Sequence, residues 1–278
     1  MAIVAIIPAR FGSTRLPGKP LSQINGKPMV QHVWERARLA QAVDRVLVAT
    51  DDERIAEVVR AFGGEVVMTS QAHATGTDRL AEAAAGTDAE IVVNVQGDEP
   101  MLDASFIDGM VAPLRAEADL PMSTVSLPLT DVEEMLSSAV VKVVSDARGH
   151  ALYFSRSPIP FVRDAVDMLR DHQPEEWLRA AAVQAVSRRL ARKHVGLYAY
   201  RREALLRFAS LPPAPLEQAE SLEQLRALHH GMKIRVVPME GQSGVAVDTP
   251  QDLERVRAIM AGGAFPNTRK TWLPNTSS

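Results

Sequence analysis

Through the first part of the chain, short runs of apolar and β-branched residues alternate with stretches whose apolar positions recur at helical spacing. Residues 2–7 predict a buried strand, and residues 27–40 predict a helix with Pro28 in its first turn. The same pattern predicts further strands at residues 45–49, 65–68 and 91–95, and further helices at residues 52–62 and 77–85. Strands and helices that alternate in this way form a parallel sheet with helices on both faces. We therefore predict a Rossmann-like α/β fold with a mostly parallel sheet.

The pattern changes after about residue 120, where turns rather than long helices separate the strands. The later elements predicted are strands at residues 122–127, 140–144, 151–154, 194–200 and 233–237, and helices from Glu203, at residues 216–229 and at residues 251–260. Residues 164–193 match no pattern that we recognise. We divide one continuous domain into a first half, residues 1–120, and a second half, residues 121–261. Residues 262–278 lack periodicity, and we expect a poorly ordered tail.

Composition and charge exclude several classes of function. The net charge is −3 at pH 7, so no basic footprint indicates a nucleic-acid partner. The absence of cysteine excludes disulfides, thiolate nucleophiles and cysteine-based zinc sites. The apolar run at residues 2–7 is too short to span a bilayer, and no charged segment precedes it as in a signal peptide. We expect a cytoplasmic protein without membrane insertion.

The segment after the first strand, residues 8–20, is rich in basic residues and in glycine and proline. It holds three cations, Arg10, Arg15 and Lys19, with two glycines and three prolines. Glycine permits close backbone approach and proline stiffens a loop, so this segment can form a pocket for a polyanion such as a triphosphate. Open α/β sheets bind ligands at this end of their strands. The alternative is a solvated loop that binds nothing, and the segment matches neither the Walker A nor the dinucleotide-binding glycine pattern.

Two aspartates are candidate metal ligands. Asp98 follows the strand at residues 91–95, where Gly97 lets the chain turn toward the same crevice. Mg²⁺ takes one or two carboxylates together with phosphate oxygens and water, so a carboxylate opposite the cationic loop favours a metal site over a simple turn. Asp248, taken alone, is most simply the cap of the helix at residues 251–260.

Polar residues near the helix at residues 77–85 and in the second half are candidates for substrate binding. Thr77 or Asp78 is expected to cap that helix, whose first N–H groups are free to bind a ligand. Arg156 ends the strand at residues 151–154, and its planar guanidinium suits a carboxylate, although a surface ion pair is the alternative.

The strand at residues 194–200 and the helix at residues 216–229 carry the remaining candidates. Alternation places His194, Gly196, Tyr198 and Tyr200 on one face of the strand, as expected for core, interface or sugar-binding groups. In the helix, Glu217 and Glu220 lie in the first turns, where acids favour the macrodipole, and we assign them no other role. Glu223 and Gln224 follow, beside the apolar face.

Several of these segments resemble one family. Residues 7–20 are similar to the signature loop of the CMP-sugar synthetases. Residues 25–29 and the Val-Asp-Thr-Pro-x-Asp-Leu segment at residues 247–253 are similar, within that family, to the CMP-Kdo synthetases, which act on 3-deoxy-manno-octulosonate (Kdo). The resemblance spans roughly residues 3–260 and fails at residues 164–193 and in the tail. Ala199 stands where the family usually has glycine.

The resemblance implies a fold of the nucleotide-diphospho-sugar transferase type, with CTP bound by the first half. The second half then forms a smaller subregion that binds the acceptor and dimerises. It implies transfer of CMP from CTP to the anomeric hydroxyl of Kdo, for lipopolysaccharide biosynthesis, by a Mg²⁺-dependent homodimer. The roles that it implies are nucleotide binding by Arg10, Arg15, Lys19, Gly76, Thr77 and Gln96, catalysis by Arg15, Lys19, Asp98 and Asp248, Mg²⁺ binding by Asp98 and Asp248, and Kdo binding by Arg156, His194, Tyr198, Glu223 and Gln224.

Two other functions stay open at this point. One is another CMP-sugar synthetase, such as an acylneuraminate cytidylyltransferase. The other is a non-catalytic nucleotide-binding regulator, although a pure binder has little need for both Asp98 and Asp248. No residue stands out as a general base. We expect the dimer interface near residues 194–229.

Overall fold

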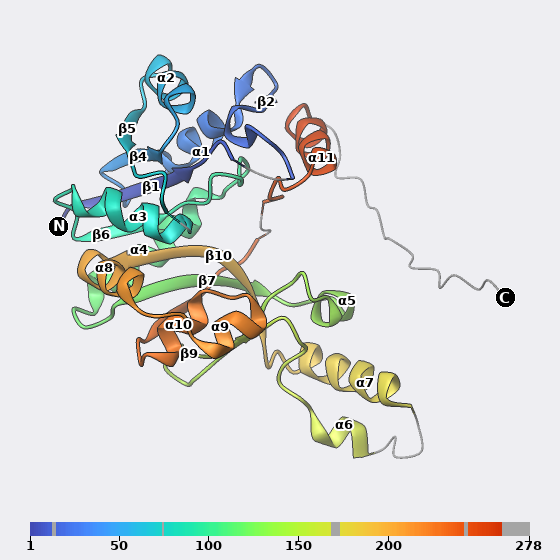
Figure 1. Cartoon of the computed structure of the whole chain (residues 1–278). Helices are drawn as coiled ribbons and strands as arrows, with labels where there is room; N and C mark the ends of the chain where they lie inside the picture. Colours follow the sequence, from blue (N-terminus) through green and yellow to red (C-terminus); the bar gives the residue numbers. More distant parts are fainter. Residues whose placement is uncertain (13–14, 74, 168–172, 242–243, 263–278) are drawn as a thin grey trace.

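The computed structural model describes residues 1–12, 15–73, 75–167, 173–241 and 244–262, and the tail at residues 263–278 lies outside them. One central sheet is covered by helices on both faces (Figure 1). The α/β class predicted from the alternation of strands and helices is therefore confirmed. Within the described residues, no helix is long and apolar enough to cross a membrane.

Seven strands form the main path of the sheet in the order β11-β7-β10-β6-β1-β4-β5. Their bounds are Ile3–Ala9 for β1, Arg45–Thr50 for β4, Glu65–Met68 for β5, Ile91–Asn94 for β6, Met122–Pro128 for β7, Arg192–Arg201 for β10 and Ile234–Pro238 for β11. β1 pairs in parallel with β4 and β6, whereas β10 is antiparallel to β6 and β7. β1 lies between two strands and is buried on both faces, which explains its unbroken apolar run.

Two small strand pairs extend this framework. β8 (Lys142–Ser145) pairs with β10 and with β9 (Ala151–Ser155). β2 (Gln23–Ile24) and β3 (Lys27–Pro28) form a two-residue ladder just after the cationic loop. The predicted helix at residues 27–40 therefore begins later, because its first two residues belong to β3.

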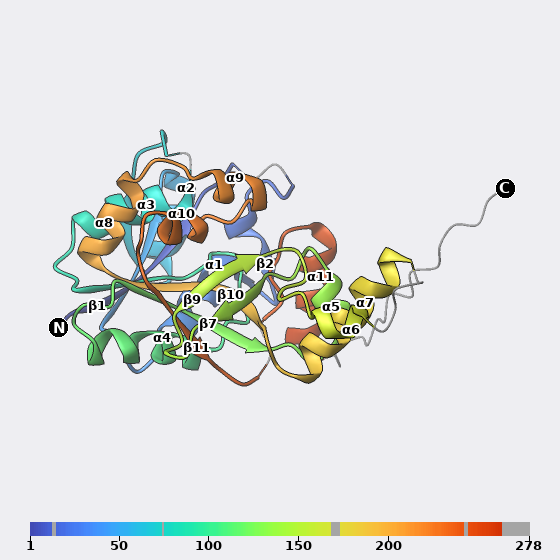
Figure 2. The same cartoon turned by 90° about the horizontal axis from the view of Figure 1, so that it is seen from below.

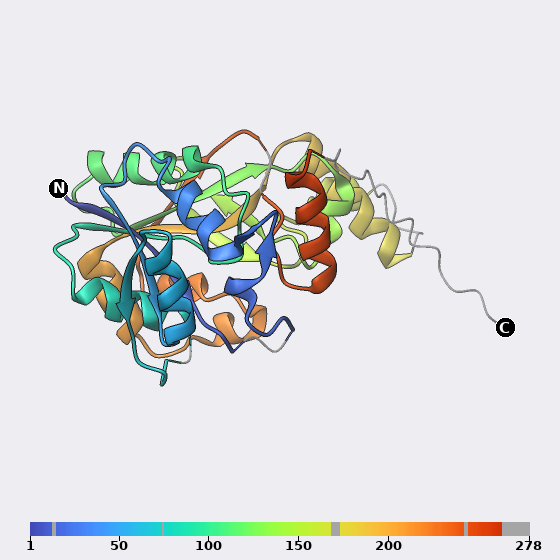
Figure 3. The same cartoon turned by 90° about the horizontal axis from the view of Figure 1, so that it is seen from above.

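Helices cover both faces of the sheet, and one of the faces is covered by helices from both halves of the chain (Figures 2 and 3). One face packs against α1 (Met29–Ala37), α2 (Glu53–Ala61) and α4 (Ala104–Ala116). The other face packs against α3 (Gly76–Ala85), α8 (Arg202–Ser210) and α10 (Gln224–His229). α4 was not predicted from the sequence, although Asp103 caps it and its apolar residues recur at helical spacing.

The segment that sequence analysis could not assign is largely helical and has its own small core. α5 (Val132–Leu136), α6 (Arg163–Asp167) and α7 (Pro174–Ser187) pack together and extend away from the sheet (Figure 1). Pro174 and the acids that follow it start α7 as helix-start rules expect, but its outer face keeps Leu178 and Val183 exposed. Because apolar residues lie on both the buried and the exposed face of α7, hydrophobic periodicity does not reveal the helix.

The single helix predicted at residues 216–229 is wrong. The chain forms α9 (Pro215–Glu220) and α10, separated at Ser221, whose backbone is left-handed at φ 51°. Left-handed backbone is rare outside glycine, so hydrophobic periodicity gave no sign of the break. The final helix is confirmed as α11 (Pro250–Met260).

The aromatic face predicted for β10 is confirmed. The His194 and Tyr198 ring centroids lie 5.5 Å apart, and those of Tyr198 and Tyr200 lie 5.9 Å apart. Tyr200 then stacks on Phe208 of α8. β10 is bonded along both edges and packs its aromatic face inside the chain. Its expected role in a dimer interface therefore does not fit its position.

Candidate active site at the carboxyl edge of the sheet

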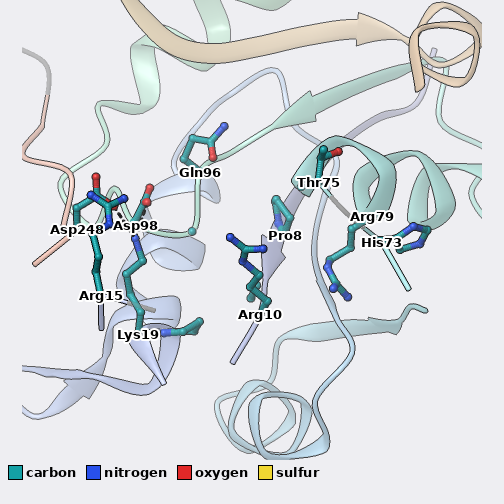
Figure 4. A pocket seen from close by; sticks show the side chains of 14 residues that line it. Pro8, Arg10, Arg15, Lys19, His73, Thr75, Arg79, Gln96, Asp98 and Asp248 are labelled. Atoms are coloured by element: carbon teal, nitrogen blue, oxygen red, sulfur yellow. Dashed lines mark hydrogen bonds and ion pairs between the residues drawn. The ribbon is translucent and has the colours of Figure 1, made fainter. Parts of the chain in front are cut away.

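A cavity of about 310 Å³ opens beyond the carboxyl ends of β1 and β6 (Figure 4). Segments that are far apart in the sequence form its walls. The lining residues are Pro8, Ala9, Arg10, Arg15, Lys19, Pro20, His73, Thr75, Gly76, Arg79, Gln96, Gly97, Asp98 and Asp248. The cavity thus collects every residue predicted to bind nucleotide or metal except Thr77.

The loop after β1 is held by contacts of its own. Gly18 adopts the left-handed conformation at φ 67°, and its N–H donates to the Phe11 carbonyl at 3.1 Å. The Phe11 ring lies against Gly18 and carries the Arg54 guanidinium 3.4 Å from its centroid. Lys19 follows in a 3-10 turn, η1 (Lys19–Leu21). Phe11 and Gly18 therefore contact each other within the loop, and Phe11 links it to Arg54 of α2.

Lys19 joins the two aspartates that lie far apart in the sequence. Its Nζ donates to Asp98 Oδ2 at 2.8 Å, to Asp248 Oδ1 at 3.1 Å and to the Val247 carbonyl at 2.9 Å. Arg15 donates to the same Asp248 oxygen at 3.1 Å. Figure 4 shows this cluster at one end of the cavity, Arg79 and His73 at the other, and Arg10 between them. Two carboxylates and several cations thus face one space.

Backbone contacts explain why these aspartates meet. The Val247 N–H donates to the Asp98 carbonyl at 2.9 Å, which ties the loop after β6 to the turn before α11. A Cβ at Gly97 would lie 2.9 Å from the Pro8 carbonyl oxygen, so only glycine lets this loop pass so close to the end of β1. The cap of α11 is Thr249 with Asp252, and the simple reading of Asp248 as that cap is wrong.

The start of α3 forms the wall across from Lys19. Thr75 is its N-cap and makes a capping box with Asp78, so the predicted cap at Thr77 or Asp78 is misplaced. Gly76, the first helical residue, lines the cavity. Free N–H groups and the positive end of the helix dipole make such a start suitable for an anion.

Two basic residues of this wall and one acid beside Asp98 were not predicted from the sequence. Arg79 is buried, with Nη2 2.9 Å from Asp51 and Nη1 bonded to Thr69, and His73 pairs with Glu82. Burial, and then the charge of Asp98, raise the pKa of Glu99 to about 7. Arg79 lies within α3, and the helical spacing of its neighbours gives no sign that its side chain lines a cavity.

A second cavity of about 170 Å³ adjoins the first and shares Pro8, Gly76 and Gln96 with it. Its other lining residues are Thr77, Asn94, Tyr198, Tyr200, Phe208, Glu223 and Gln224. Thr77 Oγ1 donates to Glu223 Oε2 at 2.5 Å. Burial raises the pKa of the Glu223 carboxyl, and the Thr77 hydrogen bond opposes that rise. Asn94 Oδ1 and Glu223 Oε1 are buried acceptors without a hydrogen-bond partner, which suits a ligand rich in hydroxyl groups.

Comparison with known proteins decides the family. Residues 4–234 match the family model described as Cytidylyltransferase. The chain is 55% identical to the 3-deoxy-manno-octulosonate cytidylyltransferase of Geobacter metallireducens over 256 residues, which cover 92% of this chain and 96% of that protein. It is 53% identical to that of Syntrophotalea carbinolica, over 94% of this chain and 100% of the other. A solved structure of CMP:2-keto-3-deoxy-manno-octonic acid synthetase complexed with CTP matches with a TM-score of 0.83 and 44% identity, over 94% of this chain and 99% of that one.

The chain belongs to the 3-deoxy-manno-octulosonate cytidylyltransferase family. The resemblance noted in the sequence is thereby confirmed. Apart from Asp248, the residues that line both cavities lie within residues 4–234, which the family model matches.

Two residues that the family resemblance assigned to Kdo lie outside both cavities. The Arg156 guanidinium donates to the main-chain carbonyls of Ser138, Glu220 and Ser221. His194 lies 2.9 Å from Thr124 Oγ1 through Nε2, with its ring edge-on to Phe154. Their assigned role stays a prediction, whereas Tyr198, Glu223 and Gln224 line the second cavity as the resemblance implies.

Proposed function

We propose that this chain transfers CMP from CTP to the anomeric hydroxyl of Kdo and releases pyrophosphate, as a step of lipopolysaccharide biosynthesis. The observation that carries the proposal is the junction of two cavities at one sheet edge. One is lined by cations and carboxylates, and the other by hydroxyl, amide and carboxylate groups. The names of the relatives indicate the substrates CTP and Kdo. The two cavities offer each of them a binding site of suitable chemistry.

In the first cavity, Arg10, Arg15 and Lys19 bind the triphosphate, and the start of α3 with Gln96 contacts the rest of the nucleotide. The reaction needs the sugar hydroxyl held in line with the α-phosphorus, so most of the catalysis is positioning and neutralisation of charge. Lys19 and Arg15 stabilise the charge that develops on the phosphates. We assign no general base.

We propose that Asp98 and Asp248 bind Mg²⁺ with the nucleotide. Among the described residues no group of three or more histidines and acids could form a metal site alone. Two carboxylates that converge on one ammonium fit Mg²⁺ instead, because this ion takes one or two carboxylates and completes its shell with phosphate oxygens and water. Bound there, the ion would neutralise phosphate charge and lower the pKa of the attacking hydroxyl.

In the second cavity, Tyr198, Glu223 and Gln224 bind the acceptor sugar. Asn94 Oδ1 is a buried acceptor without a hydrogen-bond partner, and Glu223 Oε1 has only a 3.5 Å ion pair with Arg226. A buried acceptor without a hydrogen bond is costly unless a ligand donates to it. A sugar with several hydroxyl groups supplies such donors. Thr77, which donates to Glu223, contributes to the acceptor side of the junction.

We further propose a cytoplasmic homodimer. The exposed large apolar residues Phe161, Leu178, Val183 and Leu190 lie on or beside α6 and α7, which extend from the body of the chain. A second copy would cover them. We therefore propose the interface at these exposed residues instead of at residues 194–229, because the latter segment is mostly packed within the chain.

The test measures pyrophosphate release from CTP and Mg²⁺, with and without Kdo, and with N-acetylneuraminate in place of Kdo. We expect release that requires both Kdo and Mg²⁺. CTP binding without Kdo-dependent release would favour the non-catalytic regulator, and release with N-acetylneuraminate alone would favour the acylneuraminate enzyme.

A further inference from the structure

Behind the second cavity, the chain breaks between α9 and α10 at Ser221, whose backbone is left-handed at φ 51° and ψ 48°. Glu223 and Gln224 follow this break at once and line the cavity. The direction in which they point is therefore set by whatever holds Ser221 in place. A non-glycine residue keeps this backbone only when its surroundings impose it.

The Glu220 carboxylate is the first element of that support. It accepts from Ser155 Oγ at 2.6 Å, from the Arg156 N–H at 2.9 Å and from the Tyr153 hydroxyl at 3.4 Å. Burial alone would raise the pKa of Glu220, but these hydrogen bonds lower it. The end of α9 is thus joined to the end of β9 through a charged group.

Arg156 holds the same turn from the other side. Its Nε donates to the Glu220 carbonyl at 2.8 Å, and its Nη2 lies 3.4 Å from the Ser221 carbonyl. The last carbonyls of a helix lack partners within the helix, and a cation there satisfies them. The buried Lys142 completes the support, because its Nζ bonds the carbonyls of Arg156, Ser137 and Val140.

We propose that Glu220 is a positioning residue for the acceptor sugar. Through Arg156 and the Ser221 turn it directs Glu223 and Gln224 into the second cavity. Glu220 is itself absent from the lining of either cavity, so it acts through these residues and not by touching substrate. The identity of the sugar rests on the proposed function. The contacts of Glu220 and Arg156 that support the positioning role are independent of that function.

The test compares Glu220→Gln with wild type in steady-state kinetics for Kdo and for CTP. The amide keeps one acceptor oxygen, but it loses the charge and turns an NH₂ group toward the donors of β9. We expect KM for Kdo to rise about tenfold, the effect of losing one hydrogen bond to a charged group, with KM for CTP within twofold. Glu57→Gln, at an exposed position of α2, is the charge-matched control and should match wild type.

Amide hydrogen exchange supplies a second measurement that does not need activity. The amides of Leu222, Leu225 and Arg226 bond within the turn and the start of α10, and Glu220→Gln should speed their exchange. Ser155→Ala removes one donor only and serves if Glu220→Gln does not fold. An unchanged KM for Kdo, or equal losses for both substrates, would overturn the proposal. If wild type shows no turnover with Kdo, the proposed function fails, and unchanged exchange at these amides then overturns the positioning role separately.

Discussion

Burial lowers the pKa of His194 from 6.5 to about 3, so one ring links the stability of this fold to acid. The ring lies edge-on to Phe154, with centroids 4.9 Å apart, and next to Tyr198. The Thr124 hydroxyl donates to the Leu197 carbonyl at 2.7 Å, which leaves Thr124 Oγ1 as the acceptor for His194 Nε2.

The sign and size of the effect follow from linkage. Below pH 6.5 the unfolded chain binds a proton at His194, whereas the folded chain does not bind it until about pH 3. The free energy of unfolding therefore falls as pH falls through this window. Between pH 7.5 and pH 5 the loss amounts to at most about 2 kcal/mol, because partial solvent contact of the ring can only reduce it. His194→Phe keeps the ring contacts and cannot titrate. It should cost about 1 kcal/mol at neutral pH through the lost hydrogen bond.

Urea unfolding at pH 7.5, 6.5 and 5, at one protein concentration, measures the prediction. We expect wild type to lose more stability than His194→Phe between the two extremes, by up to about 2 kcal/mol. Tyr198→Phe is the control, because burial keeps the pKa of Tyr198 well above 10 and its hydroxyl does not titrate in this range. Parallel losses in wild type and His194→Phe would show that His194 is protonated without penalty in the folded state, and would refute the reasoning.

Three further predictions concern the junction of Lys19, Asp98 and Asp248. Asp98→Asn should fold normally and lose nearly all Kdo-dependent pyrophosphate release, about a thousandfold or more, and wild-type-like turnover would exclude the metal role. Lys19→Met should lower turnover by roughly a hundredfold to a thousandfold, because a preorganised cation is lost, and a change below tenfold would contradict this. Thr249→Ala removes the cap of α11 and should cost about 1 kcal/mol in thermal unfolding, whereas an unchanged melting temperature would show that Asp252 suffices alone.

The parts of this site that the sequence predicts share one property. Arg10, Lys19, Asp98 and Gln96 follow buried strands, and the carboxyl ends of parallel strands meet at one edge whatever the rest of the chain does. Strand periodicity therefore places them without any knowledge of long-range contacts. For Asp248 the residues alone favoured a helix cap, and only the family resemblance indicated the cavity.

What the sequence does not predict depends on tertiary contacts. The Ser221 break is held by Arg156, which follows β9 and donates to the Glu220 and Ser221 carbonyls, and by the Glu220 carboxylate, which accepts from the Arg156 N–H. No local propensity encodes these long-range contacts. In the sequence, Glu220 looks like an ordinary acid in the first turns of a helix. The prediction that it serves only the helix dipole is wrong, because its carboxylate accepts a hydrogen bond from Ser155. Arg79 is a similar case, because its buried position depends on its ion pair with Asp51, which lies 28 residues earlier in the sequence.

The position of α11 links the end of the chain to the cationic loop at its beginning. Val247, Leu253 and Val256 form a separate apolar cluster with Ile24 and Met29, which lie just after that loop. The same segment carries Asp248, and Val247 supplies both the N–H that bonds Asp98 and the carbonyl that bonds Lys19. The site can therefore be complete only when α11 is packed. Lys19, Asp98 and Asp248 come from three separate segments, so loss of that small cluster would separate Asp248 from the other two without disturbing the main sheet.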